Sequence, residues 1–163
     1  MKLFIRISLL CTFLLPLASM AATPKEEAQQ LVDAILPFAQ QMLSKHKEFY
    51  PFGAQLNNAG KVEQVGAYNG NEHPPSAELI DLLHAGFVAK AKAGQVRATA
   101  LAYDVRVQPP GSSAKSDAVA VELEHRDGYN VTVYFPYTIQ NGAAPFGTPF
   151  TTAGPHRVFG GGS

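Results

Sequence analysis

Residues 117–140, DAVAVELEHRDGYNVTVYFPYTIQ, decide the fold class because they predict two strands joined by a tight turn. Every second residue is apolar over 119–123, and the same alternation recurs over 129–135. A period of two residues is the signature of half-buried strands. The stretch therefore predicts an antiparallel hairpin with one apolar face.

The register of this hairpin follows from its turn. A two-residue loop would place Glu124 opposite Val131 and set a charge against the apolar row. A three-residue loop over 126–128 instead pairs Leu123 with Val131 and keeps the apolar residues together. Gly128 can supply the left-handed conformation that such a loop needs. We therefore predict the three-residue loop.

The composition is typical of one globular domain. The chain has 163 residues, of which 46% are hydrophobic and 16% charged, which is enough apolar material for a core. The formal net charge is zero, and no stretch is rich in Lys and Arg. The sequence therefore does not favour nucleic-acid binding.

The first 22 residues have the pattern of a cleaved secretory signal. Lys2 and Arg6 provide the positive start, residues 7–17 the apolar core, and residues 19–21 the small side chains that a signal peptidase reads. The apolar run is shorter than the roughly 20 residues of a membrane span. We therefore predict cleavage and export to the periplasm or the medium, rather than a membrane anchor.

Cys11, the single cysteine, lies inside the apolar core of this signal. A lipoprotein is the alternative, but Leu10 stands where a lipoprotein signal has a small residue. Cleavage leaves no cysteine, and so no disulfide and no thiolate metal site. It also removes Lys2 and Arg6, which leaves 11 basic against 13 acidic residues and a net charge of −2.

Helix and strand patterns follow one another along the remaining chain. Thr23 and Glu26 have the spacing of a helix start, and apolar residues follow at helical spacing to about residue 46. Ser76 is expected to cap a second helix that stops at Gly94. The other expected elements are a hairpin with strands over 49–56 and 61–68, a loop over 69–75, a strand over 96–107, a loop over 108–116 and an irregular tail over 141–159.

This order predicts an α+β fold, with a single domain over residues 23–159. We expect an antiparallel sheet of about five strands with two helices packed against it. Ala98, Ala100 and Ala102 share one face of the long strand, and such small side chains let a helix approach the sheet. Residues 160–163, GGGS, are expected to be a flexible tail or a linker scar.

The densest group of ionisable residues is EHRD at 124–127. His125 with Asp127 or Glu124 would suit general-base catalysis in a small hydrolase. In the predicted register, however, Glu124 faces away from His125, which continues the apolar row, so a structural histidine is favoured. No metal or cofactor is predicted, because no ligand spacing of a metal site joins the histidines at positions 46, 73, 84, 125 and 156.

Three short motifs are similar to those of a family of small uncharacterised bacterial proteins. They are FYPFG at 49–53, an EHxxG followed by a PY step within 124–137, and a closing RVF at 157–159. The resemblance covers most of residues 49–159. It implies a compact α+β domain and carries no established activity.

Without a catalytic constellation, the exported domain is expected to act by binding. The favoured function is a periplasmic binding or inhibitory protein with a protein partner, such as an immunity protein against a toxin delivered to the periplasm. The alternatives are the small hydrolase and an oligomerising module, such as a homodimer, that adds strands at a sheet edge. Neither a nucleic acid nor, after signal cleavage, a membrane is an expected partner.

The binding site is predicted beside the loop over 69–75. Tyr68, Glu72 and His73 offer an aromatic anchor and two polar groups. Tyr50 is expected nearby if the first hairpin holds that end of the domain together. The loop over 108–116 is a poorer candidate because its residues are small or flexible, apart from Lys115.

Overall fold

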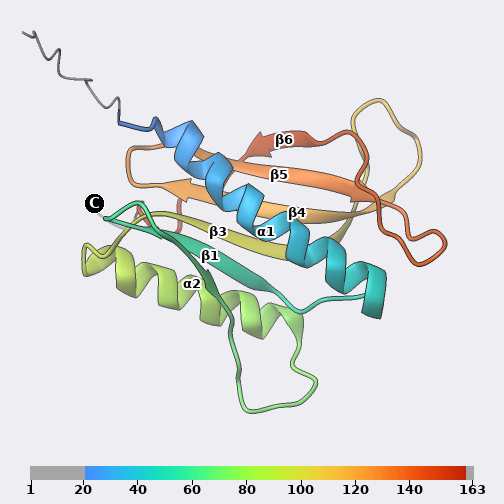
Figure 1. Ribbon diagram of the computed structural model, residues 1–163, viewed down its shortest axis with the longest axis horizontal. Coiled ribbons are helices and arrows are strands. Elements are labelled where there is room, and N and C mark those ends of the chain that lie inside the picture. The colour runs from blue at the N-terminus through green and yellow to red at the C-terminus, as the bar shows by residue number, and fades with distance from the viewer. Residues whose placement is uncertain (1–20, 161–163) are drawn as a thin grey trace, which may run out of the picture.

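The hairpin predicted from residues 117–140 forms part of a larger sheet (Figure 1). The structure, a computed structural model, describes residues 21–160. Leu123 pairs with Val131, and Gly128 has a φ of +88°. Both findings confirm the predicted three-residue loop, in which the glycine adopts a conformation that a side chain would strain.

Two helices and six strands make up this part of the chain, and the predicted α+β class is confirmed. All neighbouring strands are antiparallel, in the order β2-β1-β3-β4-β5-β6. The elements are α1 (Pro24–His46), β1 (Phe52–Asn57), β2 (Val62–Val65), α2 (Ser76–Lys92), β3 (Val96–Val107), β4 (Ser116–His125), β5 (Asn130–Tyr137) and β6 (Phe150–Ala153).

The sixth strand lies in the tail that the sequence predicts to be irregular. β6 pairs with β5 and places Phe150 beside Tyr134, with the two rings stacked at a centroid distance of 4.9 Å. The strand has four residues and no apolar alternation. Its pairing therefore depends on the partner strand and leaves little trace in the local sequence.

The two helices lie on opposite faces of the sheet, and β3 contacts both. Ala98, Ala100 and Ala102 face α1 and share its apolar core. Leu101 and Tyr103, the alternate residues of β3, belong to the second core with α2. The row of alanines thus lies under a helix, as the sequence predicts.

Both helix starts illustrate how local chemistry fixes an element. Thr23 and Glu26 form a reciprocal capping box at α1, as predicted, and α1 ends one residue before Lys47, which is left-handed at φ 68°. Ser76 does not cap α2, and this prediction is wrong. The cap residue is Pro75, whose carbonyl accepts the first amide bonds, so Ser76 is the first helical residue.

The first hairpin forms as expected, and its register is Gly53 opposite Val65 and Leu56 opposite Val62. Gly53 also lets α2 approach the sheet. A Cβ at this position would lie 2.6 Å from the ring of Phe87 and 2.7 Å from the carbonyl oxygen of Ala100. No side chain fits in that space.

The predicted signal falls almost wholly on residues 1–20, which lie outside the described residues. Within residues 21–160, no helix is long and apolar enough to cross a membrane. The predicted cleavage site precedes Thr23, the cap of α1. Cleavage there would leave the helix and its cap complete.

Candidate functional site

The segment between β2 and α2 presents Tyr68, whose exposed fraction is 73%. Two hydrogen bonds of Asn69 hold the backbone beside it. The Asn69 side-chain amide donates to Glu78 at 2.6 Å, and its oxygen accepts from the Asn71 amide at 3.0 Å. A large aromatic ring therefore projects into solvent from a tied loop and is not buried in the core.

Tyr50 lies against the same loop. Its hydroxyl is 3.3 Å from Nδ1 of His73 and 3.5 Å from the carbonyl oxygen of Glu72. The structure thus brings together three of the four predicted binding residues. Tyr68 sits on the same loop, and no hydrogen bond joins its side chain to the other three within the described residues.

Leu82 extends this surface, although it lies among the apolar residues of α2. Helical periodicity assigns Leu82 to the buried stripe of α2, yet 44% of it is exposed. It lines a shallow hollow with Asn69, Glu78 and Asp81, of about 370 Å³. We call Tyr50, Tyr68, Glu72, His73 and Leu82 the Tyr68 surface.

His125, the candidate catalytic residue, differs from Tyr68 because its ring is buried and both ring nitrogens have partners. It is 2% exposed. Its Nδ1 accepts from the backbone amide of Asp127 at 3.0 Å, and its Nε2 is 2.9 Å from a carboxylate oxygen of Glu27. The neutral ring therefore carries its proton on Nε2, directed at Glu27. The predicted structural role of His125 agrees with this geometry.

The partners proposed for His125 in a hydrolase are poorly placed. Glu124 points to the opposite face of the sheet, where it accepts the amide of Val158 at 2.9 Å. The Asp127 carboxylate is 3.8 Å from Nδ1, whose lone pair already accepts an amide. A substrate has no access to the imidazole in this arrangement.

Glu27 is the residue that sequence reasoning misses. It is 6% exposed and lies between His125 and Arg97, whose guanidinium is 2.6 Å from its carboxylate. A signal was present, because Glu27, Leu31 and Ile35 repeat every four residues along α1. A carboxylate on the apolar face of a helix requires a buried partner.

A second buried cluster lies on the α2 face. His84 of α2 has Nε2 3.4 Å from Glu122, and the Tyr103 hydroxyl donates to Glu122 at 2.8 Å. Burial alone would raise the pKa of Glu122, but the contacts with His84 and Tyr103 outweigh it and lower that pKa. Burial and the same hydrogen bond raise the pKa of Tyr103.

This second cluster is incompletely satisfied. Within the described residues, neither ring nitrogen of His84 has a hydrogen-bond partner, and one carboxylate oxygen of Glu122 has none. The 3.4 Å contact is an ion-pair distance without hydrogen-bond geometry. Among residues 21–160, no group of three or more potential ligands could hold a metal ion.

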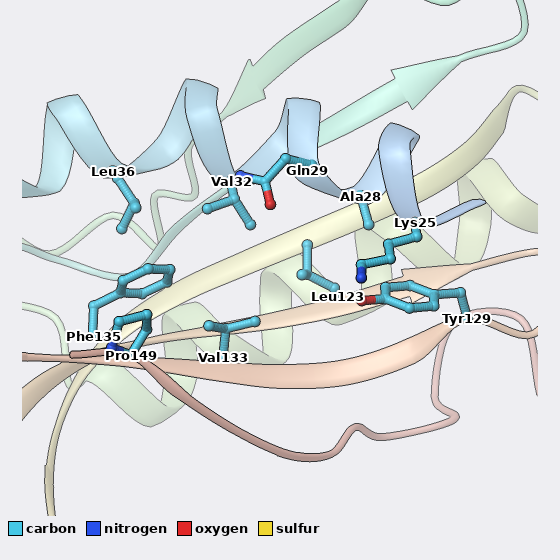
Figure 2. A pocket seen from close by; sticks show the side chains of 10 residues that line it. All are labelled: Lys25, Ala28, Gln29, Val32, Leu36, Leu123, Tyr129, Val133, Phe135 and Pro149. Atoms are coloured by element: carbon cyan, nitrogen blue, oxygen red, sulfur yellow. The ribbon is translucent and has the colours of Figure 1, made fainter. Parts of the chain in front are cut away.

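An apolar groove runs between α1 and β5 (Figure 2). It exists because α1 packs over β1, β3 and β4 and leaves β5 less covered. Its volume is about 270 Å³. Six of the residues that line it are Lys25, Val32, Leu36, Tyr129, Val133 and Phe135. We call this the α1–β5 groove.

The motifs behind the family resemblance have structural roles in the described part of the chain. Gly53 of FYPFG makes room for Phe87. His125 of the EHxxG motif binds Glu27. The PY tyrosine, Tyr137, donates to Asp104 at 2.9 Å, and the terminal Phe159 packs against the second core. These four residues lie away from the Tyr68 surface, whereas Tyr50 of FYPFG belongs to it.

Comparison with known proteins gives no family. No family model matches the chain, and neither the curated proteins nor the solved structures contain a match.

Proposed function

We propose that the protein is an exported binding protein that recognises a protein partner through the Tyr68 surface. The observation that carries the proposal is the placement of Tyr68, which is 73% exposed on a loop tied by Asn69. Tyrosines are enriched at interface hot spots, and a loop fixed before binding loses little conformational freedom on association. Inhibition of the partner, as by an immunity protein, is the expected outcome of binding.

The charges around Tyr68 define the chemistry of the partner. Glu72, Glu78 and Asp81 surround the hollow and the loop. We therefore expect a basic patch on the partner, with an apolar group that enters beside Leu82. Complementary charge would favour the correct partner and speed its encounter.

Export is part of the proposal. It is supported by the signal pattern and by a predicted cleavage site that leaves the α1 cap intact. N-terminal sequencing of material from the periplasm or medium should begin at Ala22 or Thr23. Protein that keeps Met1 and sediments with membranes would refute export and leave the binding proposal to its own test.

A photo-crosslinking amino acid at position 68, introduced in the native host, tests the binding surface. The matched control carries the same amino acid at Ser113, which is exposed in the loop between β3 and β4. We expect a defined adduct with a single protein from position 68 and none from 113. Adducts from both positions, or from neither, would contradict a specific interface at Tyr68.

The captured partner then allows a quantitative measurement. Tyr68→Ala should weaken its binding by about 1–3 kcal/mol, the effect of removing a hot-spot aromatic, with an unchanged circular dichroism spectrum. If Tyr68 and His73 can both be truncated without effect while truncation of Tyr134 abolishes binding, the interface lies on the sheet, and the proposed surface is wrong.

A further inference from the structure

The α1–β5 groove is polar at one end and apolar at the other. Figure 2 shows the Lys25 ammonium group and the Tyr129 hydroxyl together at one end, with Leu36, Phe135 and Pro149 at the opposite end. Val32 and Val133 lie between them, together with the amide of Gln29, which donates to Asp33. A ligand that matches this gradient has one charged or polar end and one hydrocarbon end.

Lys25 has no acidic partner within residues 21–160. The two neighbouring carboxylates are already engaged. Glu26 closes the capping box with Thr23 at 2.8 Å, and Glu27 binds Arg97 and His125. The polar end of the groove therefore offers an ammonium group whose charge is not neutralised by the fold, which favours an anionic ligand.

The size of the groove limits the apolar part of the ligand. A volume of about 270 Å³ falls just below the range of roughly 300–1,000 Å³ in which drug-sized ligands bind. The walls are half-buried side chains of β5, which are packed against the α1 core on one side and open on the other. A hydrocarbon chain of medium length fits this space better than a long lipid tail.

We infer that the α1–β5 groove binds a medium-chain monocarboxylate, with its carboxylate at Lys25 and Tyr129 and its hydrocarbon chain along Val32 and Val133 towards Phe135. This site is separate from the Tyr68 surface and does not depend on the proposed function. Its ligand is held by apolar burial along the groove and by one charge-assisted contact at the mouth.

An NMR titration tests this inference: octanoate is added to the isotope-labelled protein, and the amide chemical shifts are followed. We expect saturable shifts centred on Val32, Val133 and Phe135. Acetate, which has the head group alone, should produce none of them, and 1-octanol, which lacks the charge, should bind more weakly. Shifts that are absent, that do not saturate or that lie outside the groove would overturn the proposal.

Charge removal provides the sharper comparison. Lys25→Gln should weaken octanoate binding about three- to tenfold, as expected for loss of a charge-assisted contact at a partly open site, and should leave 1-octanol binding unchanged. The control is Lys115→Gln, which removes the same charge from the exposed loop over 108–116. Equal effects of both variants would mean non-specific attraction and would refute a site at Lys25.

Filling the groove gives an independent check. Val133→Phe adds volume at the centre of the groove and should abolish octanoate binding, while a thermal melt reports whether the variant is folded. A folded Val133→Phe variant that still binds octanoate would overturn the proposal. Tyr68→Ala should bind octanoate like the wild type. The octanoate proposal and the partner proposal can therefore be refuted independently.

Discussion

The two faces of the sheet each bury a His–Glu pair, and the pairs differ in how completely their atoms are satisfied. On the α1 face, both ring nitrogens of His125 have partners, and Glu27 also binds Arg97. On the α2 face, His84 lies 3.4 Å from Glu122 without a hydrogen bond at either ring nitrogen. The same two residue types thus give a closed network on one side and an incomplete one on the other.

The difference shows that burial of a histidine says little about its contribution to stability. A buried polar atom without a partner costs its full desolvation free energy, whereas a paired one recovers most of that cost. His125 is therefore expected to stabilise the fold strongly, and His84 is expected to contribute much less, through its contact with Glu122 alone. Identical substitutions on the two faces test this contrast.

His125→Leu should have the largest effect. The substitution leaves Glu27 buried with Arg97 as its remaining partner, and we expect a loss of about 3 kcal/mol in the free energy of unfolding. Urea denaturation followed by circular dichroism measures it. A loss below about 1 kcal/mol, the usual net value of a single hydrogen bond, would show that the Glu27 network does not hold α1 to the sheet.

His84→Leu is the matched variant on the α2 face, and its effect should be smaller. It removes two unpartnered nitrogens and keeps an apolar side chain against the core. Glu122 loses the contact with His84 that helps to lower its pKa, but it retains its bond from Tyr103. We expect a change within about 1 kcal/mol of zero, from the same denaturation measurement. A loss as large as that of His125→Leu would remove the contrast between the faces.

The smallest expected effect is on the pH dependence of the stability. The pKa of Glu122 is lowered in the fold by His84 and Tyr103 in spite of burial, so its ionised form stabilises the protein above the ordinary glutamate pKa. That contribution is lost as the pH falls through the lowered value. Glu122→Gln should therefore flatten part of the stability decrease below about pH 5, measured by urea denaturation at a series of pH values.

An unaltered pH profile in Glu122→Gln would mean that this carboxylate titrates alike in the folded and unfolded chain. Glu63→Gln is a useful comparison, because the pKa of Glu63 is also lowered, by Gln55, but at a more exposed site on the edge strand β2. The buried substitution should change the profile more than the exposed one, since solvent screens the latter.

Most of the fold could be predicted because its signals are local. Alternation over 119–135, the turn at Gly128 and the row of alanines in β3 together set the hairpin register and the helix-bearing face. The strand β6 could not be predicted, since four residues without alternation acquire their conformation from pairing with β5. Ser76 was misplaced as a cap because the Pro75 carbonyl serves instead.

The candidate sites were harder to predict because they depend on which elements pack against each other. The Tyr50 contact with residues 72 and 73 follows from loop composition and from the closure of one hairpin. The Glu27–His125 network and the α1–β5 groove depend on which strand α1 crosses. Sequence periodicity reports which face of an element is buried, and it does not report what that face meets.

The contact between Glu27 and His125 also orders the folding process in time. It joins residues 98 positions apart, whereas β3, β4 and β5 pair with their neighbours along the chain. Nearby pairings close small loops and form first, while distant ones carry a larger entropic cost. A growing chain therefore holds α1 early but cannot bury its charged residue until β4 has emerged. Since α1 also contacts β1 and β2, which follow it closely in the chain, it is the Glu27 network and not the whole helix that must wait for β4.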